Sequence, residues 1–235
     1  MIYSADLHEI IKYFPESPVI SIAGAGGKTT LMFRLADLLE RPCVTTTTTK
    51  VGALQIRMAD ICLGYAEFPP EDPAKVMWVS PSVEPVKGKI SGFESAEFRK
   101  LAAVCRDRGF ALVNEADGAA CRHIKAPASH EPVIPSGSDV CIYCVGLDVL
   151  GKPLNNEYVH RPEILSGLTG IPEGTLITAE CIRDLLDHPE GGLKNMPAAA
   201  LKIVYLTHAD TPERISAGKW IAEHLKNYDL MCVRN

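Results

Sequence analysis

The sequence has no long apolar run and no cluster of basic residues. No stretch approaches the roughly 20 apolar residues that a membrane-spanning helix needs, so we expect no membrane partner. Lysine and arginine total 24 against 29 acidic residues, which gives a formal net charge of −5. Without a basic patch, the chain is a poor candidate for binding nucleic acid.

The first residues also lack the basic start and apolar core of a secretory signal peptide. We therefore expect a cytoplasmic protein whose eight cysteines stay reduced. Cys141 and Cys144 lie three apart in a strand-like run, so their side chains point to opposite faces of the strand. This spacing predicts two buried thiols rather than a zinc knuckle.

Internal repeats and low-complexity linkers are absent as well, and strand-like runs alternate with helical patterns along the chain. This alternation predicts an α/β fold, a mostly parallel β-sheet covered by helices on both faces. We expect a single domain over residues 1–235. Its least defined part is 52–92, where prolines surround a short strand at 76–79 and a turn at 88–92 leads to a helix at 96–108.

The most informative stretch runs from an apolar strand through a glycine turn into a helix. The turn reads Gly24-Ala25-Gly26-Gly27-Lys28-Thr29-Thr30. This order is typical of a P-loop, because glycine amides and a helix N-terminus together bind phosphate. Lys28 would reach the outer phosphates and Thr29 would hold Mg²⁺. The full P-loop pattern has a further glycine where Ile22 stands, so a plain glycine-rich turn with an exposed lysine is the alternative.

Five consecutive threonines, 45–49, follow the next strand start. One interpretation is simply a second strand, because threonine favours strands. However, buried hydroxyls each need a partner, and hydroxyls at a strand end beside the turn suit Mg²⁺ or γ-phosphate. We expect Thr47 to contact the nucleotide and Thr48 to place the attacking water.

An apolar strand at 110–115 ends in Glu115, followed by Asp117. Acids spaced by one residue face the same way, at the edge where parallel sheets bind ligands. We expect Asp117 to bind Mg²⁺ and Glu115 to orient or deprotonate a water; solvated acids at a strand end are the alternative. In the polar loop that follows, Lys125 is expected to contact substrate or phosphate, whereas zinc binding finds no fixed ligand spacing.

Several segments together resemble the YqeC-like family, described as accessory proteins of selenium-dependent molybdenum hydroxylases. The segments are GAGGKTT at 24–30, TTTTTK at 45–50, EADGA at 115–119, KAP at 125–127, HEPVIP at 130–135, VGLDVLGKPL at 145–154 and HRP at 160–162. They are spread over most of the chain. The EADGA and VGLDVLG segments are more specific than the glycine turn.

The resemblance implies a P-loop nucleotide-binding fold and a role in maturing hydroxylases that carry a molybdenum cofactor. Its segments add His130, Glu131, Asp148 and Arg161 as site candidates. Family members tend to have a guanine-reading Asn-Lys-x-Asp-like segment where this chain has Thr-His-Ala-Asp at 207–210. His208 and Asp210 would then contact the base. Because the Asn and Lys are replaced, both ATP and GTP remain open.

These patterns predict a Mg²⁺-dependent nucleoside triphosphatase that works as an accessory factor, with a molybdenum-cofactor hydroxylase or its cofactor as partner. A first alternative is an enzyme that transfers a phosphoryl or nucleotidyl group to a small acceptor held by Lys125, His130 and Arg161. A second is a nucleotide-gated binding module without turnover. A metal-delivery variant of that module would use His123, His130, His160 and Cys121.

Overall fold

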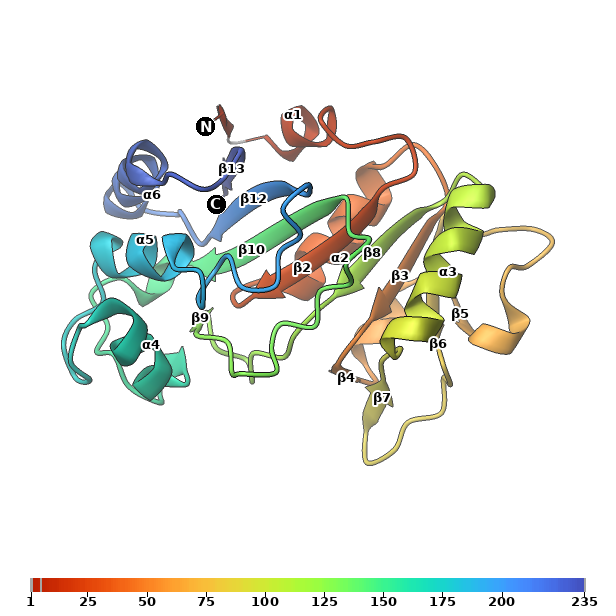
Figure 1. Ribbon diagram of the computed structural model, residues 1–235, viewed down its shortest axis with the longest axis horizontal. Coiled ribbons are helices and arrows are strands. Elements are labelled where there is room, and N and C mark those ends of the chain that lie inside the picture. The colour runs from red at the N-terminus through yellow and green to blue at the C-terminus, as the bar shows by residue number, and fades with distance from the viewer. Residues whose placement is uncertain (1, 5, 235) are drawn as a thin grey trace.

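The computed structural model describes residues 2–4 and 6–234. Within them, nine strands form one central sheet: β1 (Ile2–Ser4), β2 (Val19–Gly24), β3 (Cys43–Thr47), β5 (Ile61–Gly64), β6 (Val76–Ser80), β8 (Ala111–Glu115), β10 (Val140–Gly146), β12 (Leu201–Thr207) and β13 (Leu230–Val233). Their order across the sheet is β1-β13-β12-β10-β2-β8-β3-β6-β5 (Figure 1). Every neighbouring pair in it is parallel. The predicted α/β class with a mostly parallel sheet is confirmed.

Two small sheets lie outside the central one. β4 (Lys50–Gly52) pairs antiparallel with β7 (Lys89–Ser91), and β9 (Ile124–Lys125) pairs parallel with β11 (Val159–His160). The helices are α1 (Leu7–Ile11), α2 (Lys28–Leu38), α3 (Ser95–Asp107), α4 (Pro162–Thr169), α5 (Ala179–Asp187) and α6 (Pro212–His224). Short 3₁₀ turns occur at Gln55–Met58, Tyr65–Glu67 and Leu147–Val149.

Helices cover both faces of the central sheet (Figure 1). In β2, Ile20 and Ile22 pack with α1 and α2 on one face, whereas Val19 packs with α3 on the other. The strand's period of two explains this division, because successive side chains point to opposite faces. A third apolar cluster joins α4, α5 and α6 to the ends of β10, β12 and β13. Because helices cover both faces of the sheet, the sequences of the central strands are nearly continuous apolar runs.

Residues 52–92 contain more structure than their sequence predicts. β5 adds an edge strand to the sheet, and the segment at 88–92, which we expected to be a turn, includes strand β7. β7 forms because Ile90 pairs with Val51 and both side chains are buried. A three-residue strand whose partner lies about 40 positions away leaves no local periodicity to detect.

The described cysteines are all free thiols, and Cys141 and Cys144 are buried in β10 as expected. Among the described residues, no helix combines the length and the apolarity needed to cross a membrane.

Candidate functional site

The turn between β2 and α2 has a backbone that only glycine adopts easily. Gly24 and Gly26 have φ angles of +89° and +79°, in the left-handed region that side chains disfavour. A Cβ on Gly24 would lie 2.3 Å from the Cys144 carbonyl oxygen, and one on Gly26 would lie 2.5 Å from the Gly146 amide nitrogen. The glycines therefore let this turn pack directly against the end of β10.

The amides of this turn are arranged for an anion. Gly24 N donates to Asp117 Oδ2 at 3.1 Å and Ala25 N to the Cys144 carbonyl at 2.9 Å. Among the described residues, none accepts a hydrogen bond from the amides of 26–30; the first helical bond runs from Leu31 N to the Gly27 carbonyl at 2.9 Å. Unpaired amides at the start of an 11-residue helix provide the donors and the positive dipole end that bind phosphate.

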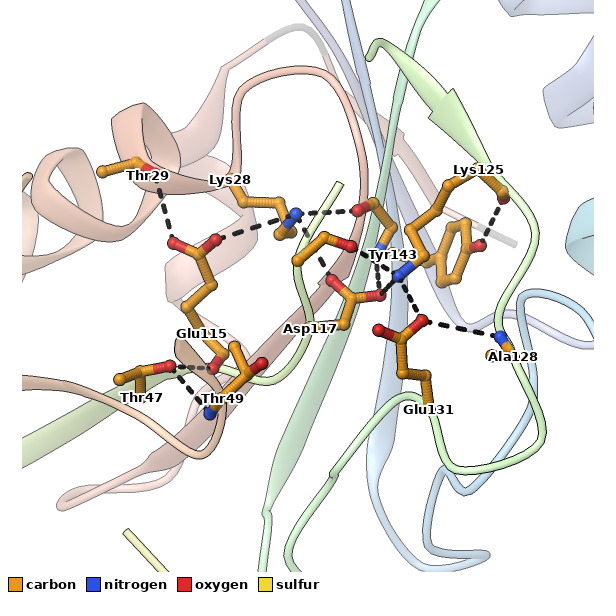
Figure 2. Close-up of polar contacts among 12 residues, drawn as sticks. Lys28, Thr29, Thr47, Thr49, Glu115, Asp117, Lys125, Ala128, Glu131 and Tyr143 are labelled. Carbon is orange, nitrogen blue, oxygen red and sulfur yellow. Dashed lines mark hydrogen bonds and ion pairs between the residues drawn. The ribbon is translucent and has the colours of Figure 1, made fainter. Parts of the chain in front are cut away.

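Lys28 lies in the first turn of α2, surrounded by oxygen atoms (Figure 2). Its Nζ is 2.8 Å from the Gly24 carbonyl, 3.3 Å from Asp117 Oδ1 and 3.7 Å from Glu115 Oε1. Burial alone would lower the pKa of this amine, but the two carboxylates outweigh it, so the pKa is raised. Lys28 is therefore held as a buried ammonium between two carboxylates.

Thr29 and Glu115 place two oxygens side by side. Thr29 Oγ1 donates to Glu115 Oε2 at 3.1 Å and accepts from Gln55 Nε2 at 3.1 Å. Burial raises the pKa of Glu115, while Lys28 and the hydroxyl oppose the shift. Hydroxyl and carboxylate oxygens are the ligands that Mg²⁺ takes. The sequence assigned the metal to Thr29 and Asp117, whereas the structure joins Thr29 to Glu115.

Asp117 belongs instead to a buried network of charges (Figure 2). Lys125 Nζ lies 3.0 Å from Asp117 Oδ2 and 2.8 Å from Glu131 Oε2, and Arg161 donates to the same Glu131 oxygen at 2.6 Å. Burial acts to raise the pKa of Glu131, but the hydrogen bonds from Arg161 and Lys125 outweigh it and lower the pKa to about 2. Lys125, Glu131 and Arg161 thus contact one another, and the substrate or phosphate contact of Lys125 stays a prediction. His130 is exposed and outside this network.

The threonine hydroxyls also have protein partners. Thr47 Oγ1 donates to the Glu115 backbone carbonyl at 2.9 Å, and Thr48 Oγ1 to the Val133 carbonyl at 2.7 Å. The two preceding threonines likewise donate to carbonyls of β6. The roles expected of Thr47 and Thr48 at the nucleotide and the attacking water stay predictions, since both hydroxyls donate to protein carbonyls here. The hydroxyls of Thr45, Thr46 and Thr47 satisfy the hydrogen-bonding needs of a buried strand, whereas Thr48 follows the strand and is partly buried.

A cavity of about 500 Å³ opens from the glycine turn. Residues 26–30 and Glu115 line one side, and loop 118–123 lines another. The sequence missed three further lining residues, Lys50, Gln55 and Lys89. Lys50 directly follows the threonines, but Gln55 and Lys89 fall in the proline-rich segment, where no motif marks them. The lysines, with Arg122, make this a cavity suited to a polyanion.

His208 and Asp210, which were expected to contact the nucleotide base, do not line this cavity. His208 directly follows β12 and stacks on His123, with ring centroids 4.7 Å apart, and Asp148 Oδ2 is 2.6 Å from His123 Nδ1. Asp210 forms an ion pair with Arg214 in the first turn of α6. Of these residues only His123 lines the cavity. The structure therefore gives Asp148 and His208 a common neighbour and gives Asp210 a cationic partner.

Comparison of the sequence with known proteins identifies the family of the chain. The family model described as "YqeC protein" matches residues 20–163, more than half of the chain. The chain is 31% identical over 221 residues to a protein of Escherichia coli (strain K12) named "Uncharacterized protein YqeC", covering 92% of this chain and 85% of that protein. No solved structure matches the chain. The segment that the family model matches begins in β2 and includes the glycine turn and both acids.

Proposed function

Because the chain belongs to the YqeC family, we propose that it is a Mg²⁺-dependent nucleoside triphosphatase, using ATP or GTP, that assists maturation of a molybdenum-cofactor hydroxylase. One observation carries the triphosphatase part. Lys28 Nζ lies 2.8 Å from the Gly24 carbonyl at the head of a turn whose following amides have no protein acceptor among the described residues. Unpaired amides and a nearby ammonium are groups with which proteins bind a triphosphate, and Lys28 would turn from its present oxygen partners to reach the phosphates.

Each residue of the site then has a defined task. The amides of 26–30 bind the β- and γ-phosphate oxygens, and Lys28 balances their charge. Thr29 and Glu115 would hold Mg²⁺, which supplies neutralisation of charge that develops on the phosphates. Asp117 is a positioning residue, because it accepts from the Gly24 amide at 3.1 Å and fixes Lys28 through an ion pair at 3.3 Å.

Glu115 is also the candidate for orienting the attacking water. Its carboxylate lies at the end of β8 beside the Thr29 hydroxyl and lines the cavity, where an acceptor could orient a water. The cavity beside it is open to water and contains the Thr29 hydroxyl. Of the two water-placing groups that the sequence suggests, Glu115 and a threonine hydroxyl, this assignment takes Glu115.

A second candidate function is transfer of a phosphoryl or nucleotidyl group to a small acceptor. The observation that favours it is the far wall of the cavity, where loop 118–123 and Arg122 face the same space as the glycine turn. An anionic acceptor bound there would lie next to the phosphates. The maturation role rests on the family resemblance, and its partner would be the hydroxylase or its cofactor.

Product analysis separates these functions. Purified protein is incubated with Mg²⁺ and ATP or GTP, and products are followed by phosphate release and mass spectrometry, with Glu115→Gln as the inactive control. Free phosphate in the absence of an acceptor supports hydrolysis, whereas turnover only with added acceptor supports transfer. Binding without turnover in either case would replace both with a nucleotide-gated binding module, detected by nucleotide-dependent capture of a hydroxylase.

A further inference from the structure

A second set of metal-binding side chains lies beside the glycine turn. His123 precedes β9, Asp148 lies in the 3₁₀ turn after β10, and His208 follows β12. One possible ligand atom from each residue lies within 4.8 Å of the other two. Two ligands bound to one ion at about 2.0–2.2 Å lie at most about 4.4 Å apart. To bind one ion, the three ligand atoms would have to move closer, and the two imidazole rings, which are stacked at an interplanar angle of 11°, would have to turn so that a nitrogen of each points at the ion.

The carboxylate of Asp148 gives an independent indication of a ligand. Its Oδ2 is 2.6 Å from His123 Nδ1, but its Oδ1 is buried and has no hydrogen-bond partner among the described residues. A buried carboxylate oxygen without a donor is costly and calls for an ion or a donor. A cation held by the two imidazoles would supply the missing interaction.

The backbone around this group is arranged to bring it together. Gly146 has no room for a side chain, because a Cβ there would lie 2.7 Å from Asp148 Oδ1 and 2.8 Å from His123 Cβ. His208 has a φ angle of +57°, in the left-handed region, and its ring stacks on that of His123 at an interplanar angle of 11°. Left-handed residues other than glycine occur often at binding sites, where the surrounding structure holds them.

We propose that His123, Asp148 and His208 bind one divalent transition-metal ion of the class that prefers imidazole, such as Zn²⁺, Co²⁺, Ni²⁺ or Fe²⁺. Two imidazoles and one carboxylate favour this class over Mg²⁺, which takes oxygen ligands. The site is therefore distinct from the Mg²⁺ position at Thr29 and Glu115.

The proposed metal site lies between two cavities. His123 and Asp148 line a cavity of about 180 Å³, and His123 also lines the 500 Å³ cavity of the glycine turn. Three protein ligands leave a coordination position for water or a small ligand, as in metal sites that react or exchange. The ion would thus occupy the boundary between the nucleotide cavity and a second, smaller pocket.

The test is a titration of metal-free protein with Co²⁺ in the absence of nucleotide, followed by visible absorption and calorimetry. We expect one Co²⁺ per chain, d–d absorption bands that excess Mg²⁺ does not remove, and a higher melting temperature with Co²⁺. His208→Ala and Asp148→Asn should each weaken binding by roughly a hundredfold. His130→Ala, which removes an exposed histidine outside the group, should leave binding unchanged.

Circular dichroism of the metal-free variants checks that each one folds. Absence of cobalt bands in the wild-type protein would overturn the proposal and leave His123 and Asp148 as a hydrogen-bonded pair. Co²⁺ binding that survives both His208→Ala and Asp148→Asn would overturn it too, because the ion would then bind elsewhere. Since no nucleotide is present, either result is independent of the proposed triphosphatase.

Discussion

Thr29 Oγ1 donates a hydrogen bond to Glu115 Oε2 at 3.1 Å, and this contact joins the first turn of α2 to the end of β8. Lys28 lies beside the same carboxylate, with its Nζ 3.7 Å from Glu115 Oε1. A hydroxyl, a carboxylate and an ammonium thus meet beside the amides of 26–30, which have no acceptor among the described residues. The proposed phosphate chemistry depends on this junction.

Glu115→Gln should separate nucleotide binding from hydrolysis. The amide keeps an acceptor for the Thr29 hydroxyl but loses the charge and the basicity, so we expect the hydrolysis rate to fall by about a hundredfold or more. Nucleotide affinity measured without Mg²⁺ should change little, because the turn amides and Lys28 remain. Phosphate release and calorimetry measure the two effects, with Glu97→Gln, an exposed residue of α3, as the matched control. Hydrolysis at the wild-type rate would remove Glu115 from the mechanism.

Gly26→Ala should damage the turn. The left-handed φ of +79° costs about 1–2 kcal/mol for a residue with a Cβ, and the added methyl would lie 2.5 Å from the Gly146 amide nitrogen. We expect a lower urea midpoint and much weaker nucleotide binding. Gly137→Ala is the matched control, since its Cβ would meet no atom within 4 Å. If both variants bind nucleotide like the wild type, the turn is not the phosphate site.

Glu131 should contribute stability that depends on pH. Its pKa is about 2 in the folded protein against an ordinary value of 4.5, because Arg161 and Lys125 donate to it. A folded-state pKa below the unfolded value stabilises the protein above pH 4.5, and this stabilisation is lost as the pH falls towards 2. The difference in unfolding free energy between wild type and Glu131→Gln should therefore be constant near neutral pH and shrink below about pH 4.5.

Urea unfolding at a series of pH values measures this difference, and Glu97→Gln reports the general effect of losing one exposed negative charge. A difference that stays the same down to pH 3 would mean that the Glu131 ion pairs do not stabilise the fold.

The sequence predicted the parts of the site that depend on local order. The glycine turn, Lys28 and Thr29 are contiguous, and Glu115 ends a strand that is clearly apolar, so the parallel sheet was enough to place them at one edge. Their motif does not depend on contacts from distant parts of the chain. That is why both the strand–turn–helix order and the sheet type could be read from the residues.

The sequence could not predict which hydrogen-bond or ion-pair partner each polar side chain has. Asp117 and Glu115 share a strand-end pattern, yet only the folded chain shows that Asp117 faces Lys125 and Glu115 faces Thr29. The threonine hydroxyls were equally ambiguous until β6 and β8 supplied carbonyl acceptors. The stacking of His123 on His208 joins residues 85 positions apart in the sequence, and no spacing rule reaches that far.

Calorimetric titration of the wild-type protein and Lys28→Ala with ATP and GTP in the presence of Mg²⁺ tests the central claim most directly. Lys100→Ala, which removes an exposed lysine on α3, is the matched control. We expect the wild type and Lys100→Ala to bind at least one of the two nucleotides, and Lys28→Ala to bind at least about a hundredfold more weakly, a loss of about 2.7 kcal/mol. Removing the buried cation between two carboxylates can unfold the chain, so circular dichroism accompanies each titration. Failure of the wild type to bind either nucleotide, or unchanged affinity in a folded Lys28→Ala variant, would contradict the account.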